Sequence, residues 1–181
     1  MGKYIACIVA VGLLTAAAQA PGLAADDGLA AWGKIVGVLQ NPRCMNCHQA
    51  TSPLQGEAQK PHVPHVVGGP TGTGTSGMRC SSCHKAVNDP MSGAPGAKDW
   101  RLAPSTMIWQ NKSSAELCAM LKDPKTNGAR NGDALIEHMS TEPLVLWGWA
   151  PGAPRTAVPL AHKDFVAAMH QWVASGMPCP K

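Results

Sequence analysis

Hydrophobic residues recur at spacings of three and four along four stretches of the chain, a pattern that predicts amphipathic helices. These stretches span residues 26–40, 113–123, 133–140 and 162–175. Pro42 and Pro124 follow the first two and Gly176 follows the last, as expected for residues that end helices. Ser113 and Glu116 have the spacing of a capping box, which marks the start of the second helix. We therefore expect a mainly α-helical fold.

Long segments between the expected helices show neither helical nor strand periodicity. Residues 50–79 and 88–104 are interrupted by proline and glycine, so we expect loops there. The glycine-rich run 68–74 lacks the lysine of a phosphate-binding loop, and we assign it no nucleotide role. Residues 144–149 form an apolar run that suits either a short strand or a buried turn. Short helices joined by long loops are thus expected in a single domain over residues 26–181.

The N-terminal residues have the order of a secretory signal peptide. Lys3 provides a positive charge, residues 4–18 are apolar, and small residues follow. We expect a signal peptide over residues 1–25, cleaved between Ala20 and Ala25, and a mature protein in the periplasm. A retained membrane anchor is the alternative, but the apolar run is short for a spanning helix. No stable membrane span is therefore expected after cleavage.

The composition is poor in residues that fill an ordinary core. The chain has one Phe, its one Tyr lies in the expected signal peptide, and it contains 19 Gly and 16 Pro. Such a chain closes an apolar core with difficulty, and a buried prosthetic group would supply the missing apolar surface. The formal charge of +4 is spread over scattered basic residues without a Lys/Arg block, which argues against nucleic-acid binding.

The sequence Cys-x-x-Cys-His, the attachment motif of c-type haem, occurs twice. The two copies consist of Cys44, Cys47 and His48, and of Cys80, Cys83 and His84. In this chemistry each cysteine sulfur bonds to one haem vinyl group and each histidine binds the iron. Two covalently attached haem c groups are therefore expected. Arg43 and Arg79, directly before the motifs, are either propionate partners or solvated side chains.

A zinc site built from the four thiolates is the alternative to haem. Histidine follows the second cysteine in both copies, and the chain is expected to be exported, so haem is favoured. Two further cysteines, Cys118 and Cys179, remain once Cys7 is assigned to the signal peptide. In an oxidising compartment they are expected to form a disulfide between the last helix and the capping-box helix. Two unrelated buried thiols are the alternative for this pair.

Each haem iron would have either a sixth ligand or an open position, and this choice separates an electron carrier from an enzyme. We expect six-coordinate irons, with His62 and His138 as first-choice distal ligands and Met107 in reserve. His62 lies in the connector between the motifs, where His65 could replace it. His138 lies on the apolar face of an expected helix, where an unpaired imidazole would be costly to bury. A hydrogen-bonded structural histidine or a core methionine is the alternative for each candidate.

Segments spread over nearly the whole chain resemble the small exported dihaem cytochromes of the isoquinoline 1-oxidoreductase subunit family. The similar segments are residues 41–48, 77–84, 100–104 with Met107, 122–124, 127–128, 137–138, 144–149 and 178–180. Residues 55–57 look like a variant of an acidic stretch in the family. The resemblance implies a haem-organised, cytochrome c-like domain that passes electrons from a molybdenum-containing hydroxylase or aldehyde dehydrogenase to a downstream acceptor. The last helix, which carries Trp172, resembles the closing helix of cytochromes c and would then pack on the first helix, with an ordinary amphipathic helix as the alternative. The family name does not fix the substrate.

Two functions are consistent with these expectations. The first is an electron-transfer cytochrome that performs no bond-making chemistry and serves a partner oxidoreductase and the respiratory chain. The alternative is a small dihaem peroxidase, which needs one open iron position and an acid–base residue above it. The chain is short for a dihaem peroxidase and has enough histidine and methionine to fill both irons, so the carrier is favoured.

Overall fold

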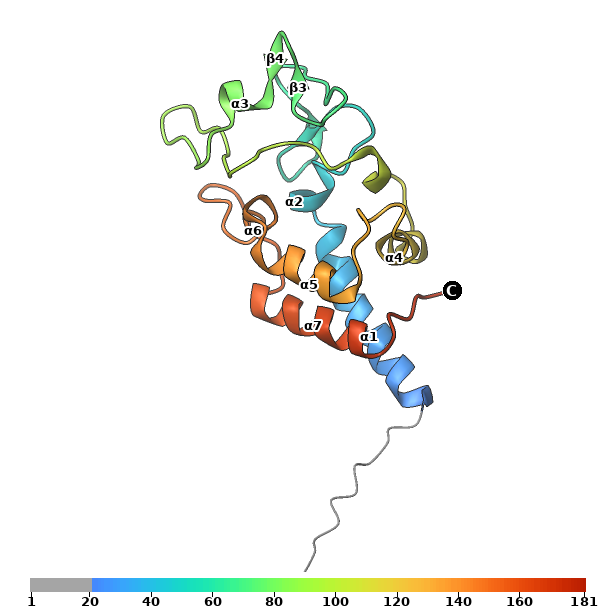
Figure 1. Ribbon diagram of the computed structural model, residues 1–181. Coiled ribbons are helices and arrows are strands. Elements are labelled where there is room, and N and C mark those ends of the chain that lie inside the picture. The colour runs from blue at the N-terminus through green and yellow to red at the C-terminus, as the bar shows by residue number, and fades with distance from the viewer. Residues whose placement is uncertain (1–20) are drawn as a thin grey trace, which may run out of the picture.

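Four helices form the lower half of the molecule in the computed structural model (Figure 1). They are α1 (Pro21–Leu39), α4 (Ser114–Lys122), α5 (Gly132–Thr141) and α7 (His162–Ala174). The structure describes residues 21–181, with side chains from residue 25 onward, so the predicted signal peptide lies outside the described residues up to residue 20. All four predicted helices are present, and α1 begins five residues before its predicted start. Within residues 21–181, no helix has the length and apolar character needed to cross a membrane.

Local sequence signals define the ends of these helices. At α4 the Ser113 hydroxyl accepts a hydrogen bond from the Glu116 N–H, and the Glu116 carboxylate accepts one from the Ser113 N–H. This confirms the predicted capping box. At α5 the Asn131 side chain accepts a hydrogen bond from the Ala134 N–H. Gly176 has a φ of +79° just after α7, a conformation that glycine adopts without strain, which confirms that the helix ends there.

The core lies where α1 and α7 pack together, as predicted. Trp32 of α1 and Trp172 of α7 are both buried, and their ring centres lie 5.1 Å apart. Ile35 and Phe165 extend this contact and are completely buried. The remaining fully buried side chains of this core include Leu39, Leu117, Cys118, Leu121 and Met169. Burial of each large apolar side chain contributes about 1.5–3 kcal/mol, so this four-helix contact is the main stabilising element of the lower half.

A disulfide joins Cys118 of α4 to Cys179 near the C-terminus, which confirms the predicted pair. Trp172 of α7 donates a hydrogen bond from Nε1 to the carbonyl of Pro178, at 2.9 Å. The closing segment of the chain is therefore attached to α4 covalently and to α7 through a buried indole.

Short elements and loops make up the upper half of the molecule (Figure 1). Its helices are α2 (Pro42–Met45), α3 (Cys80–Cys83) and the 3-10 helix η1 (Ser105–Met107). Two antiparallel hairpins pair β1 (Leu54–Gln55) with β2 (Lys60–Pro61), and β3 (Gly74–Thr75) with β4 (Met78–Arg79). Apart from these two-residue strands, the predicted loops over 50–79 and 88–104 are confirmed. The strand alternative for 144–149 is wrong, because α6 (Pro143–Leu146) occupies this run and Pro143 stands at its first position, which favours a helix start.

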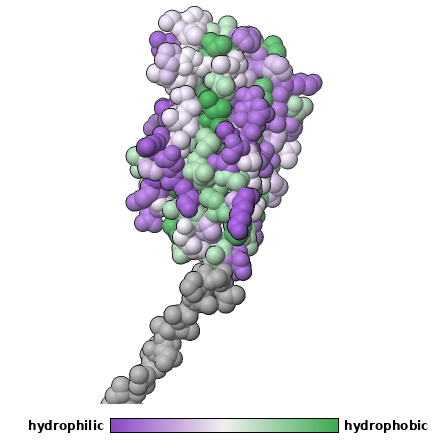
Figure 2. Space-filling view, turned by 90° about the vertical axis from the view of Figure 1, so that its right-hand side faces the viewer, coloured by the Kyte–Doolittle hydropathy of each residue, from purple (hydrophilic) through white to green (hydrophobic). Residues whose placement is uncertain are grey.

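The upper half has almost no hydrophobic core of its own. Between Leu39 and Ala97 no hydrophobic side chain is buried, although this stretch contains both Cys-x-x-Cys-His motifs. The large apolar side chains that are exposed within it are Val63, Val67, Met78, Val87 and Met91. Strongly apolar residues reach the surface in the upper part of Figure 2. A chain segment of this length needs a further apolar partner to become stable.

Candidate haem attachment sites

Both motifs fold into a short helical turn that is closed by the histidine. In each copy the histidine N–H donates to the carbonyl of the first cysteine, at 3.3 Å for His48 and 2.9 Å for His84. The first turn lies in α2, where the Asn41 side chain caps the helix by accepting a hydrogen bond from the Arg43 N–H at 2.9 Å. The second turn is α3 itself. Because the same hydrogen bond closes both turns, each histidine is held directly beside its cysteines.

The His48 ring is fixed on two sides. Its Nδ1 lies 2.7 Å from the carbonyl oxygen of Met107, and its face stacks on Trp109 with ring centres 3.3 Å apart and planes 14° apart. A carbonyl only accepts hydrogen bonds, so Nδ1 carries the proton and Nε2 keeps its lone pair. Burial lowers the pKa of His48 to about 4, against the effect of the Met107 hydrogen bond. The ring is therefore a neutral imidazole with Nε2 available to a metal, the form in which histidine binds metals.

The His84 ring repeats this arrangement. Its Nδ1 lies 2.7 Å from the carbonyl oxygen of Pro95, and its face stacks on Trp100 with ring centres 4.6 Å apart and planes 6° apart. Burial lowers the pKa of His84 below its ordinary value, which again favours the neutral ring. Trp147 meets the edge of Trp100, with ring centres 5.0 Å apart, and so fixes the stacking partner. The two motifs therefore present their imidazoles in the same way, with a backbone carbonyl on Nδ1 and an indole on the face.

His62 is the predicted distal residue that lies closest to His84. The two ring centres are 5.9 Å apart, and the planes meet at 60°. The Nδ1 of His62 lies 2.8 Å from the carbonyl oxygen of Pro64, so Nδ1 is the donor in this bond and Nε2 is not used by it. With metal–nitrogen bonds of about 2 Å, two imidazoles on opposite sides of one metal have ring centres roughly 6 Å apart. His65, the possible replacement for His62, is exposed.

His138 lies near His48, the histidine of the other motif. Positive charge on His138 lowers the pKa of His48 in addition to the larger effect of burial. Burial also lowers the pKa of His138 itself, followed by the positive charge of Arg130. Among residues 25–181, no hydrogen-bond partner meets the His138 ring. His138 is thus a half-buried, neutral and unpartnered imidazole on α5, next to the first motif.

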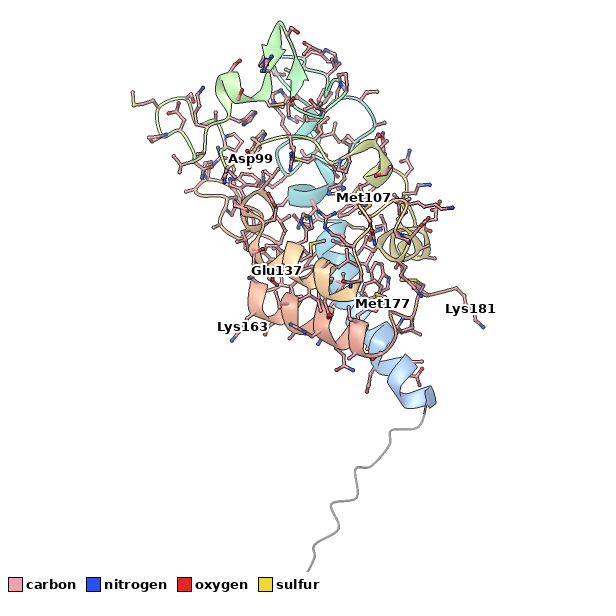
Figure 3. The ribbon with its side chains drawn as sticks, in the orientation of Figure 1. Asp99, Met107, Glu137, Lys163, Met177 and Lys181 are labelled. Atoms are coloured by element: carbon pink, nitrogen blue, oxygen red, sulfur yellow. A yellow bond between two sulfur atoms is a disulfide. The ribbon has the colours of Figure 1, made fainter. Side chains whose placement is uncertain are left out.

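The backbone carbonyl of Met107 lies on the Nδ1 side of the His48 ring. The carbonyl oxygen is the acceptor for Nδ1 of His48, and the Met107 side chain packs against the hydrophobic core. Figure 3 shows Met107 on η1, to the side of α2. A ligand to a metal held by His48 would have to approach from beyond Nε2. The structure therefore brings His138, rather than Met107, into consideration for the first motif.

The cysteines of the first motif are half-buried thiols rather than reactive thiolates. Burial raises the pKa of Cys44 to about 12 and that of Cys47 to about 11, and the charge of Cys80 raises the latter further. The influence of Cys80 on Cys47 indicates that the two motifs adjoin. In the described part of the chain no three His, Cys, Asp or Glu side chains are grouped as a metal site. The zinc alternative thus gains no support, whereas a haem iron needs at most two protein ligands because the porphyrin supplies the other four.

The two arginines before the motifs differ in their surroundings. Arg43 is buried, donates from Nε to the carbonyl of Thr156 at 2.7 Å, forms an ion pair with Glu57, and lies over the Trp147 ring at 5.6 Å. The solvated alternative for Arg43 is therefore wrong, and its pairing with a propionate stays a prediction. The Glu57 carboxylate also accepts a hydrogen bond from the Thr156 N–H, at 3.0 Å, which gives the variant stretch 55–57 a structural role.

Arg79 is exposed and lines a hollow of about 460 Å³ beside His84 and Trp100. Lys85, Lys98 and Arg101 add positive charge to its walls, and Asp99 is the one acidic residue among those lining it. Figure 3 shows Asp99 in the upper half of the molecule, on the loop before η1. A mainly cationic hollow beside a motif histidine suits the carboxylates of a haem.

One buried donor near the first motif lacks a partner. The Nε1 of Trp109 is buried without a hydrogen bond, although Trp109 stacks directly on His48. Leaving a buried N–H unpaired costs about 1–3 kcal/mol, so such a group indicates a bound acceptor. Together with the exposed apolar side chains of the upper half, this donor fits a group that is apolar over most of its surface and carries carboxylates.

The stacking tryptophans were not predicted as site residues. Trp109 and Trp100 lie at different sequence distances from His48 and His84, so no spacing in the sequence indicates their role. Comparisons with known protein families, with curated protein sequences and with solved structures found no match to this chain.

Proposed function

We propose that this chain is an exported c-type cytochrome that carries two covalently attached haem c groups and transfers electrons. The observation that carries the proposal is the repeated geometry of His48 and His84. Both follow Cys-x-x-Cys, both bond a backbone carbonyl through Nδ1, and both stack on a tryptophan. Two unrelated structural histidines would have no reason to share all three features. Histidines that bind a metal typically donate their other ring N–H to a carbonyl or carboxylate, as both rings do here.

The absence of a protein core in the upper half supports a haem-organised, cytochrome c-like domain. Residues 40–96 bury no hydrophobic side chain and instead expose several apolar ones. Val63 is 75% exposed and Val87 is 71% exposed. Two macrocycles between the motif turns and these loops would provide the apolar surface that the sequence lacks. The same reasoning explains why the chain folds with one Phe and many glycines and prolines.

The histidine pairs support six-coordinate irons. His84 with His62 forms one pair, and His48 with His138 forms the other, with Met107 as the reserve for a distal position. When bound, haem supplies an iron that accepts and releases one electron without bond making. The protein would offer it the imidazoles of His48 and His84, whose pKa values burial lowers, and would place positive charge around the second motif. A peroxidase would need an open position, which a second histidine at each iron would fill.

The proposed physiological partners follow from export and from the resemblance. We place the mature protein in the periplasm, where a molybdenum hydroxylase or aldehyde dehydrogenase type of oxidoreductase would donate electrons to one haem. A downstream acceptor of the respiratory chain would receive them from the other. The protein would have no nucleic-acid partner, because its basic residues are scattered over the sequence.

A haem count tests the proposal directly. The protein would be produced in a host with the c-type maturation machinery, and a pyridine haemochrome assay would give two haems per polypeptide. The double variant Cys80→Ala/Cys83→Ala should retain one haem. The matched control Cys118→Ala/Cys179→Ala also removes two cysteines but lies outside both motifs, and it should retain two haems.

A count of fewer than two haems in the unmodified protein would refute the dihaem assignment. Cyanide and peroxide titrations separate the carrier from the peroxidase. Two six-coordinate irons should leave the absorption spectrum nearly unchanged, whereas rapid cyanide binding at one haem would favour the enzyme.

A further inference from the structure

A ladder of backbone hydrogen bonds connects the two motifs through segments that are distant in sequence. Its bonds run from the Ala103 N–H to the Cys47 carbonyl (3.1 Å), from the Leu102 N–H to the Gly72 carbonyl (2.9 Å), and from the Cys80 N–H to the Thr73 carbonyl (3.0 Å). Ala103 and Leu102 are neighbours in the chain, as are Gly72 and Thr73. The ladder therefore passes from Cys47 to Cys80 by way of two dipeptides. The Sγ of Cys80 also lies 3.8 Å from the Gly72 oxygen, which shows how closely the second motif approaches this loop.

The glycines of the loop 68–74 allow this close approach. Gly72 has a φ of +74°, and a Cβ on it would lie 2.8 Å from the Leu102 carbonyl oxygen. A Cβ on Gly68 would lie 2.6 Å from the Leu102 side chain. Leu102 is only 8% exposed and is one of the few buried apolar side chains of the upper half. No side chain larger than hydrogen fits at Gly72 while the ladder stays in place.

A second set of bonds makes the loop rigid. The Gly68 N–H donates to the Thr51 carbonyl at 2.8 Å, and the Gly74 N–H donates to the Gly68 carbonyl at 2.9 Å. Gly74 continues into the β3–β4 hairpin, which leads directly to Cys80. The Trp109 N–H donates to the His48 carbonyl at 3.0 Å, so the first motif is also held by the segment that follows Leu102 and contains η1. Both ends of the ladder are thus anchored.

We propose that this ladder sets the distance between the two haem attachment points and forms the bonded route by which an electron passes between them. Gly72 is its central positioning residue. The inference rests on the proposed function, since it concerns the transfer of one electron from the reduced site to the oxidised site, with no proton or atom moving. The loop 68–74 is then a spacer between the two redox centres, and its glycines are required because side chains would separate them.

The test compares two glycine variants that differ in their surroundings. Gly72→Ala introduces a Cβ against the Leu102 carbonyl, whereas Gly77→Ala in the same region adds a Cβ with nothing within 4 Å. After one-electron reduction by a laser flash, absorption spectroscopy follows the redistribution of the electron between the haems. Gly77→Ala should match the unmodified protein. Gly72→Ala should keep two haems. Its rate of electron redistribution between them should fall roughly tenfold, equivalent to about 1.4 kcal/mol in barrier height.

Equal redistribution rates in Gly72→Ala and Gly77→Ala would overturn the inference. The single-haem variant Cys80→Ala/Cys83→Ala provides the baseline, because it has no second haem to receive the electron. If Gly72→Ala loses a haem or fails to fold, amide hydrogen exchange in the unmodified holoprotein tests the ladder instead. The ladder requires slow exchange at Leu102 and Ala103, and rapid exchange there would overturn it. Fewer than two haems in the unmodified protein would instead refute the proposed function itself, which the haemochrome assay detects first.

Discussion

His62 and His84 place their imidazole rings 5.9 Å apart and bond their Nδ1 atoms to proline carbonyls, those of Pro64 and Pro95. Proline has a fixed φ, so each acceptor is held by a stiff segment of chain. Both rings are oriented by their own surroundings and not by each other. Two imidazoles that are pre-oriented in this way, at the spacing expected for a metal between them, are consistent with the proposed ligand pair of the second haem.

The first prediction concerns His62. In His62→Ala the second haem should lose its distal ligand and change from low spin to high spin, while the first haem stays low spin. Electron paramagnetic resonance and near-infrared magnetic circular dichroism would detect the change. His65→Ala is the matched control, because His65 is exposed and only three residues away. A high-spin signal in His65→Ala alone would assign the ligand to His65 instead.

The second prediction distinguishes His138 from Met107 at the first haem. His138→Ala should convert this haem to high spin, since His138 is the half-buried, unpartnered imidazole near His48. Met107→Ala should leave the spin state unchanged, because Met107 bonds the His48 ring through its backbone carbonyl, which the substitution retains. Loss of a methionine–iron charge-transfer band in Met107→Ala would reverse this assignment.

The sequence predicted the helices well because their signals are local. The capping box at Ser113, the glycine after α7 and the apolar faces of α1 and α7 all act within a few residues of where they lie. The disulfide was predictable for a different reason, since cysteine counting left a single pair. These features need no knowledge of the tertiary structure.

The surroundings of the motif histidines could not be read from the sequence. The Met107 carbonyl bonds His48 from 59 residues away, and the Pro95 carbonyl bonds His84 from 11 residues away. Every residue type has a backbone carbonyl, so the sequence does not show which residue will be the acceptor. Arg43 was expected to be either a propionate partner or a solvated side chain because it precedes a motif. Its actual partner Glu57 depends on a loop whose path has no periodic signal. Contacts of this kind arise from the three-dimensional course of irregular chain, which hydrophobic patterning does not determine.

The third prediction concerns the disulfide. Cys118 and Cys179 are 61 residues apart in sequence, and closing a loop of that length should stabilise the protein by about 4 kcal/mol in the chain-entropy model. Cys118→Ala/Cys179→Ala should lower the free energy of unfolding by about this amount in urea titrations without changing the haem count. Thiol titration of the unfolded, unreduced parent protein should find neither cysteine reactive. Two titratable thiols would contradict the bond.

The fourth prediction concerns acid stability through Glu116. Hydrogen bonding from the Ser113 N–H, followed by the interaction with Lys112, lowers the pKa of Glu116 from its ordinary 4.5 to about 2. A carboxylate with a lowered pKa stabilises the folded state above its ordinary pKa, and this contribution is lost as the pH falls through about 2. Glu116→Gln keeps a capping side chain but cannot ionise. The melting temperatures of the two proteins should therefore differ at neutral pH and converge as the pH approaches 2, and a constant difference would contradict the pKa.

The last prediction separates the roles of Arg43 and Arg79, which occupy equivalent positions before the two motifs. Arg43 is buried and bonded to Glu57 and Thr156, so Arg43→Ala should lower the free energy of unfolding by about 2 kcal/mol. Arg79 is exposed in the cationic hollow beside His84, so Arg79→Ala should change stability by no more than about 0.5 kcal/mol. Its effect should appear in the reduction potential of the second haem.

The direction of that shift follows from electrostatics. A positive charge near a haem stabilises the reduced iron, which carries one positive charge fewer, so removing Arg79 should lower the potential. Arg43→Ala should change the potential of the second haem less than Arg79→Ala does, because the Arg43 charge is already neutralised by Glu57. Spectroelectrochemical titration of both variants, with urea unfolding of the same samples, measures the two effects independently. Arg79 would be excluded as a propionate partner if the potential of the second haem stayed the same or rose in Arg79→Ala.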